Sequence, residues 1–226
     1  VATVNGEGYN DGVVATEWPK GGSVTEPETL ITSKGYGPSI DVNAKGAALV
    51  AYKNSGLINH AVSVERRTPG GDWTYAGVTK TLGTKIAATP DVALSDNGQG
   101  QVIYSSLLNG HYRAETSRVK PDGTVLAAKL VGAADEDVYG VSVDINSSGK
   151  ALFAWQAVAG GNAKVRVADA ANKAFPTTSS VLVNTGADWV LPLAAITDDG
   201  RRAVQYLRGE KVVTYQSHAP GAAFQP

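Results

Sequence analysis

The chain has 226 residues, a formal net charge of −1, and neither cysteine nor methionine. Without cysteine it has no disulfide, no thiol nucleophile and no thiolate metal site, and its near-zero charge gives no general attraction to nucleic acid or anionic membranes. Charged residues make up only 18% of the chain while glycine occurs 26 times, a balance typical of many short strands joined by tight turns, and no apolar run is long enough to cross a membrane.

The first 32 residues read as the last three strands of a repeat unit whose first strand is missing. Residues 1–8 (VATVNGEG) align with residues 49–56 (LVAYKNSG), and Gly21-Gly22 aligns with Gly70-Gly71 after a slip of one residue. The repeat is therefore out of phase with the start of the chain, because the first unit begins at its second strand. We expect a partial unit over residues 1–32.

One phrase then occurs four times, at residues 38–52 (PSIDVNAKGAALVAY), 90–104 (PDVALSDNGQGQVIY), 141–155 (VSVDINSSGKALFAW) and 192–206 (PLAAITDDGRRAVQY). Its glycines, Gly46, Gly98, Gly149 and Gly200, are spaced by 52, 51 and 51 residues. Apolar and polar residues alternate on both sides of each glycine, which predicts two strands. The Asn, Asp and Gly residues between them predict a hairpin turn. A second hairpin follows each phrase.

A four-stranded unit repeated about every 50 residues is the signature of a β-propeller blade. We therefore predict an all-β fold, a single β-propeller domain over residues 1–226 with four-stranded antiparallel blades. The units are 1–32 (partial), 38–83, 90–134, 141–185 and 192–226, which gives about five blades, the first lacking its inner strand. Four blades, or a fragment of a larger propeller, are the alternatives.

The repeated phrase also resembles a known class of protein. Pro-x-Ile/Val, a glycine, a closing aromatic, an arginine-containing strand and then Gly-Gly-x-Trp resemble the repeats of secreted bacterial β-propellers, with Gly70-Gly-Asp-Trp73 the best copy. No copy completes the Asp-box turn of sialidase-like propellers. The resemblance covers essentially the whole chain and implies a lectin-like or sialidase-like architecture, but no particular activity. With the absent initiator methionine, it leads us to expect a secreted bacterial protein or an excised domain.

Several repeated side chains are better explained by structure than by chemistry. Tyr52, Tyr104, Trp155 and Tyr206 recur once per unit, and we expect them in the core with their polar tips hydrogen-bonded. Glu17, Glu65 and Glu115 also recur, and we expect a surface ladder with neighbouring arginines rather than acid–base residues. Asp41-x-Asn43 and Asp144-x-Asn146 suit polar turns, and we predict neither a metal site nor a cofactor.

The connections that differ between units are the candidate functional region. Tyr36, Tyr139 and Trp189 lie at nearly equivalent positions before the inner strands, in connections that also contain Asp137 and Asp188. His111 and Tyr112 lie in a connection between the second and third strands, which we expect on the same face of the propeller. An aromatic platform beside Asp and His suits a carbohydrate or another small polar ligand. We therefore predict ligand binding by Tyr36, Tyr139, Asp188, Trp189, His111 and Tyr112.

Because no catalytic motif is evident, the sequence favours a non-catalytic module that binds a glycan or protein partner through this loop face. The first alternative is a polysaccharide lyase or glycosidase, in which Asp137, Asp188, His111 and Tyr139 would be catalytic. A glycosidase needs two carboxyl groups facing each other at about 5–10 Å, and the spacing here does not require that. The second alternative is a structural scaffold whose incomplete first blade associates with another chain.

Overall fold

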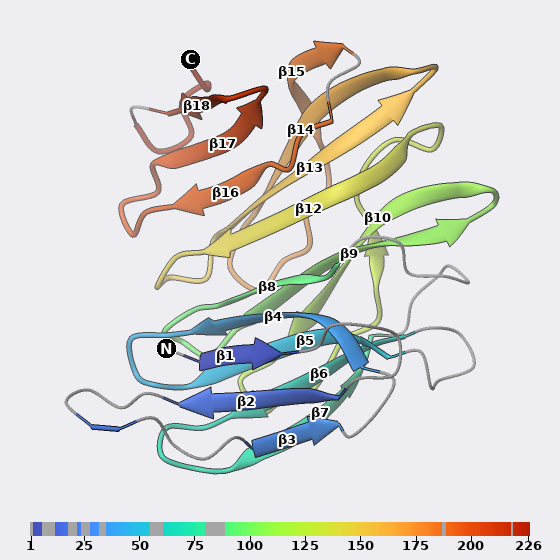
Figure 1. Cartoon of the computed structure of the whole chain (residues 1–226). Coiled ribbons are helices and arrows are strands. Elements are labelled where there is room, and N and C mark those ends of the chain that lie inside the picture. The colour runs from blue at the N-terminus through green and yellow to red at the C-terminus, as the bar shows by residue number, and fades with distance from the viewer. Residues whose placement is uncertain are drawn as a thin grey trace.

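The computed structural model describes residues 2–5, 12–17, 22–23, 28–31, 35–54, 61–79, 89–186, 189–217 and 219–226. These residues form strands and turns and contain no helix, so none offers a helix long and apolar enough to span a membrane. The strands pair into five separate antiparallel sheets, which we call the first to fifth blades in chain order (Figure 1).

The first blade has three strands, β1 (Ala2–Asn5), β2 (Val13–Glu17) and β3 (Glu28–Ile31), and the second has β4 (Gly35–Val42), β5 (Ala48–Asn54), β6 (Ala61–Arg67) and β7 (Trp73–Val78). The third has β8 (Asp91–Leu94), β9 (Gly100–Leu108), β10 (His111–Val119) and β11 (Lys129–Leu130), and the fourth has β12 (Asp137–Ile145), β13 (Ala151–Ala159), β14 (Asn162–Ala170) and β15 (Ser180–Gly186). The fifth has β16 (Leu193–Ile196), β17 (Arg202–Arg208) and β18 (Lys211–Gln216), with one further bridge between Gln216 and Gln225.

The blades follow one another along a shared inner edge. β1 lies against β4, β4 against β8, β8 against β12, and β12 against β16, and Figure 1 shows these strands side by side from the N-terminal to the C-terminal blade. A separate buried apolar cluster fills each of the four junctions between consecutive blades. The predicted all-β propeller of four-stranded blades, with a first blade that lacks its inner strand, is confirmed.

The repeated glycines end the turn between the two inner strands of a blade. Gly46, Gly98, Gly149 and Gly200 have φ between +81° and +86°, a region that other L-residues enter only at a cost. Each donates its N–H to the carbonyl three residues earlier, for example Gly46 to Asn43 at 3.0 Å. The glycines therefore shape the hairpins of the scaffold, as the sequence predicted.

The repeated aromatic side chains lie in the core, as predicted. Tyr52, Tyr104, Trp155 and Tyr206 are all at most 4% exposed. Two of them donate hydrogen bonds to buried carboxylates. The hydroxyl of Tyr52 donates to Glu65 at 3.0 Å, and the hydroxyl of Tyr104 donates to Glu115 at 3.2 Å.

The prediction of a surface glutamate ladder is wrong. Glu65 is 6% exposed and Glu115 is fully buried. Glu115 lies directly opposite Tyr104 on the neighbouring strand, whereas Glu65 lies opposite Val50 and is the diagonal neighbour of Tyr52. Period-2 alternation identifies a shared face but not which face is covered, and stacked blades cover both. The side chain of Glu17 lies outside the described residues.

Carboxylates join each inner strand to the next blade. Their Oδ2 atoms accept backbone N–H groups one repeat later, in the pairs Asp41–Leu94 at 2.6 Å, Asp91–Val143 at 2.9 Å and Asp144–Ile196 at 2.7 Å. The Oδ1 atom of each also accepts the N–H of the following residue in its own strand. Each inner strand is a sheet edge with unpaired N–H groups, so these carboxylate latches satisfy donors that would otherwise lack partners.

Two of the latch carboxylates, those of Asp41 and Asp144, lie in half-buried surroundings that change their pKa. Burial raises the pKa of Asp41 and of Asp144 above the ordinary value, although the two N–H groups that each accepts act in the opposite direction. The negative charge of Asp91 adds to the increase in both cases. The latch residues include the Asp41-x-Asn43 and Asp144-x-Asn146 pairs, so blade-to-blade bonding accounts for these aspartates.

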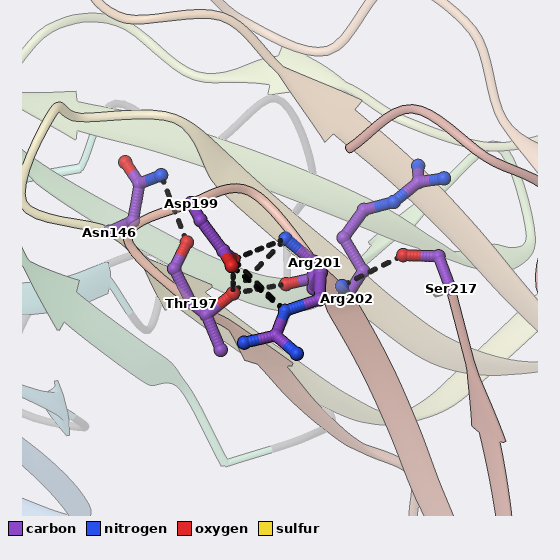
Figure 2. Close-up of polar contacts among 6 residues, drawn as sticks. All are labelled: Asn146, Thr197, Asp199, Arg201, Arg202 and Ser217. Carbon is purple, nitrogen blue, oxygen red and sulfur yellow. Dashed lines mark hydrogen bonds and ion pairs between the residues drawn. The ribbon is translucent and has the colours of Figure 1, made fainter. Parts of the chain in front are cut away.

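The asparagines of the same pairs organise the turns. Asn43 accepts the N–H groups of Lys45 and Ala47 and donates to the carbonyl of Ser95 in the next blade at 2.9 Å. Figure 2 shows the equivalent contact, in which Asn146 donates to the carbonyl of Thr197 at 3.2 Å. Turn chemistry is therefore confirmed for both asparagines, and no group of three or more His, Asp or Glu residues in the described ranges is placed to hold a metal ion.

Candidate functional site

The connections singled out in the sequence meet at one end of the inner strands. His111 is the first residue of β10, directly after the turn at Asn109-Gly110, where φ is +53° and +84°. Asp137 and Tyr139 lie at the start of β12, and Trp189 precedes β16. Residues of the third, fourth and fifth blades thus contribute to one site.

The imidazole of His111 lies beside the carboxylate of Asp137. The Nδ1 atom of His111 is 3.5 Å from Oδ1 of Asp137, and the backbone N–H of Tyr112 donates to the same oxygen at 2.7 Å. The side chains are 46% and 32% exposed, respectively, so the pair is accessible from solvent. Asp137 engages only one ring nitrogen, which leaves Nε2 of His111 as the nitrogen for a ligand or proton.

Three aromatic rings form a continuous cluster next to this pair. The ring centroids of Tyr112 and Tyr139 are 6.0 Å apart, and those of Tyr139 and Trp189 are 4.7 Å apart in an edge-to-face arrangement. Trp189 is 68% exposed, so its indole presents a large apolar face to solvent. Exposed aromatic faces of this kind suit stacking against the apolar face of a sugar ring.

Tyr139 is held in its protonated form. Burial raises the pKa of its phenol above the ordinary value, and the negative charge of Asp137 and the neighbouring Tyr112 raise it further. A phenol is protonated at neutral pH even at its ordinary pKa of about 10, and the increase makes Tyr139 less able to act as a base. The cluster therefore offers an imidazole, a carboxylate and the phenols of Tyr112 and Tyr139.

A hollow of about 380 Å³ adjoins this cluster, lined by Thr89, Tyr139, Gly140, Val141, Leu191, Pro192 and Leu193. A Cβ on Gly140 would lie only 2.6 Å from Cδ2 of Leu191, so the glycine lets the connection into the fifth blade approach β12 closely. Thr89, Leu191 and Pro192 were not among the site residues predicted from the sequence. The signal for them is their position directly before the repeated inner strands.

The remaining candidates have other surroundings. Tyr36 lies on β4 of the second blade, where the ammonium of Lys53 is 5.3 Å from its ring centroid. Lys53 is only 9% exposed, and burial lowers its pKa. Asp188 lies outside the described residues.

Glu136 belongs to the core rather than to the site. It is 2% exposed and accepts hydrogen bonds from Lys164 at 2.8 Å and from both Nε and Nη2 of Arg166. Burial alone would raise its pKa, but the two cations outweigh that effect and lower it. This carboxylate stays ionised and paired, which excludes it as a proton donor.

No protein-family model matches the chain, and no curated protein matches it either. Solved structures do match. A protein of unknown function from Dyadobacter fermentans aligns over 94% of this chain and 70% of its own at 13% identity and a TM-score of 0.58. The α-L-arabinofuranosidase of Fusarium graminearum aligns over 84% and 65% at 10% identity and 0.56. A polysaccharide lyase of family 25, an ulvan lyase, aligns over 95% and 60% at 13% identity and 0.55.

At these identities the likeness shows the fold alone, and this chain spans about 60–70% of the length of these structures. Most of the matching propellers with a stated activity are enzymes that act on carbohydrates, including an endo-arabinase and a family 117 glycoside hydrolase. This finding contradicts our prediction of a non-catalytic binding module and favours the enzyme alternative.

Proposed function

We propose that this protein is a polysaccharide-cleaving enzyme whose active site is the His111–Asp137–Tyr139 cluster. The observation that carries the proposal is the placement of an accessible imidazole–carboxylate pair next to a phenol that holds its proton, beside an exposed aromatic platform. The carbohydrate-active enzymes among the structural neighbours support a glycan substrate. A polysaccharide substrate outside the cell would also fit the secreted location that we propose.

Among the described residues, the chemistry fits β-elimination better than hydrolysis. Hydrolysis generally uses two carboxyl groups about 5–10 Å apart, whereas Asp137 is the one carboxylate that the described contacts place in the cluster. A histidine base and a tyrosine acid supply the two proton transfers of elimination without a second carboxylate. We therefore infer a lyase acting on a glycan that contains uronic acid.

In this reaction Nε2 of His111 removes the proton on the sugar carbon next to the uronate carboxyl group. The electron pair of that C–H bond forms a carbon–carbon double bond, and the bond between C4 and the glycosidic oxygen breaks. The phenol of Tyr139 donates its proton to the departing oxygen. Asp137 orients the imidazole and stabilises the imidazolium that forms, as a carboxylate does beside any histidine base, while Trp189 and Tyr139 position the sugar rings.

The experiment is a survey of uronate-containing and neutral polysaccharides that measures both new reducing ends and the ultraviolet absorbance of an unsaturated sugar. A lyase produces both signals in step. On the substrate identified, H111Q should lower kcat by about 10²–10⁴-fold, the usual contribution of a general base, and D137N should lower it at least about tenfold.

D135N is the matched control, because Asp135 is an exposed carboxylate close to Asp137 in sequence. It should retain wild-type turnover, and thermal melts should show that all variants are folded. Unchanged turnover in both H111Q and D137N would refute this active site. Reducing ends without the absorbance would refute elimination and favour hydrolysis, with Asp188 then the first residue to test.

A further inference from the structure

A second hollow lies at the opposite end of the strands, between the third and fourth blades. It has a volume of about 470 Å³ and is lined by Asn97, Gln99, Arg118, Lys120, Pro121, Asn172 and Lys173. We call it the basic hollow. Its lining contains three cations and no carboxylate. Arg118 lies near the end of β10 and the other lining residues lie in or beside turns, at the opposite end of the strands from His111.

The flanking junctions use their arginines differently. Between the second and third blades, Nη1 of Arg66 donates to the carbonyls of Lys120, at 3.1 Å, and of Pro121. A hollow at this junction is lined by Arg66 and by the carboxylate residue Asp122. Between the fourth and fifth blades, Arg202 forms an ion pair with Asp169. The basic hollow is thus the one among these three junctions whose lining has no carboxylate, although the repeat is the same.

The guanidinium of Arg118 is held in place at the basic hollow. Its Nη2 donates to Oε1 of the buried Gln99 at 3.0 Å, and its central carbon is 5.6 Å from the ring centroid of Phe175. These two contacts fix the plane of the guanidinium, and a fixed planar guanidinium is the group best suited to bind a sulfate or carboxylate.

A neutral donor lies beside the cations. Oδ1 of Asn97 accepts from the hydroxyl of Ser95 at 2.7 Å and from the N–H of Gln99 at 3.0 Å, which orients its Nδ2 group as a donor. Gly149 makes room for it, because a Cβ there would lie 2.9 Å from Nδ2 of Asn97 and 2.7 Å from Oδ1 of Asn172.

Two carboxylates, Asp96 and Asp122, are next to lining residues in the sequence, but neither lines the basic hollow. Asp122 is exposed, and its Oδ1 accepts the N–H of Thr124 at 2.9 Å. That hydrogen bond is the first cause of the lowered pKa of Asp122, and the charge of Lys120 contributes less. The three cations therefore keep a net positive field over the hollow, which attracts an anion.

We propose that the basic hollow binds an oxyanion group, a sulfate ester or a uronate carboxylate, carried by an acidic polysaccharide. Arg118 holds the oxyanion in the plane of its guanidinium, Lys120 and Lys173 add charge from two blades, and Asn97 donates a hydrogen bond. The site is separate from the proposed active site. Only the glycan nature of its ligand rests on the proposed function, and oxyanion binding does not.

The test measures the affinity of the chain for dextran sulfate, polygalacturonate and neutral dextran by calorimetry at low ionic strength, where charge interactions are least screened. The wild type should bind the two acidic polymers and not the neutral one. K120Q/K173Q should weaken binding of the acidic polymers about tenfold. The matched control is K129Q/K211Q, which removes the same charge from exposed lysines on β11 and β18 and should change the affinity less than twofold.

Equal weakening by both double variants would overturn the site, because it would mean general attraction between polyanion and protein. Binding of neutral dextran, or no binding at all, would overturn it too. Inorganic sulfate should displace the polymer poorly. If it displaces the polymer as well as the polymer's own sulfate groups do at equal concentration, the hollow binds free sulfate and the proposal of a polysaccharide ligand is overturned. The loss of affinity caused by K120Q/K173Q should be the same in an H111Q background, so a failure of the basic hollow and a failure of the active site are distinguishable.

Discussion

The carboxylate latches can be tested by replacing Asp144 with asparagine. The carboxylate accepts the N–H of Ile145 at 2.8 Å and that of Ile196 in the next blade at 2.7 Å. An amide has one acceptor oxygen, so one of these donors loses its partner at a half-buried position. A buried donor without a partner costs about 1–3 kcal/mol, and we expect D144N to reduce the free energy of unfolding by that amount.

The size of this loss should depend on pH. The pKa of Asp144 is raised by burial in the folded protein above its ordinary value of 3.8. Folding then favours the protonated form, so this group's contribution to stability is greatest at low pH and falls as pH rises through the raised pKa. D144N lacks this titration. The stability gap between wild type and variant should be widest below about pH 4, under the ordinary pKa of 3.8, and should narrow as pH rises toward neutrality.

Urea unfolding followed by tryptophan fluorescence measures this gap, since Trp155 is fully buried in the fourth blade. Titrations that both proteins share cancel in the difference. D135N, which alters an exposed carboxylate outside the latches, should stay within about 0.5 kcal/mol of the wild type. A gap that widens as pH rises would show that the charge of Asp144 is net stabilising, and no gap at any pH would show that the latch contributes nothing.

Two further substitutions test the junction between the second and third blades. Y104F removes a donor to the buried carboxylate of Glu115 and should lower the free energy of unfolding, measured in urea, by about 1–3 kcal/mol. The control is Y75F, at a residue that is 59% exposed, which should change this free energy little. Equal effects of the two substitutions would contradict the buried pair. G100A places a Cβ 2.6 Å from Cδ2 of the fully buried Leu49 and should cost about 1–3 kcal/mol by overpacking. In the double variant G100A/L49A the loss should be smaller than the sum of the single losses, and strict additivity would argue against the clash.

The repeat could be predicted because its signal is local. The glycine turns and the alternating strands are each complete within about 15 residues. Each latch spans 52 or 53 residues between carboxylate and N–H, one more than the glycine spacing of the same two units. The faces of the strands could not be predicted in the same way. Glu65 and Glu115 alternate as surface residues would, and only the stacking of the next blade shows that they are buried.

The structure brings five of the residues selected from the sequence together, but Tyr36 lies on the second blade and Asp188 lies outside the described residues. His111, Tyr112, Asp137, Tyr139 and Trp189 stood out because they differ between otherwise equivalent connections. That Asp137 would accept the N–H of Tyr112, 25 residues away, depends on how the third and fourth blades are placed. The basic hollow left no motif in the sequence, because its cations come from turns of two different repeats and become neighbours only in the folded chain.

The latches also set how cooperative the blades are. Each carboxylate reaches only the next blade, so the structure is a one-dimensional array of nearest-neighbour couplings. The series ends at the fifth blade, where Leu193 and Ala195 occupy the positions of Ser142 and Asp144, and Leu193 is 63% exposed. Separating the fifth blade breaks one junction, whereas opening the third breaks two. Within the described sheets, the second, third and fourth blades each share two junctions and the first and fifth share one, so we expect the two terminal blades to separate first.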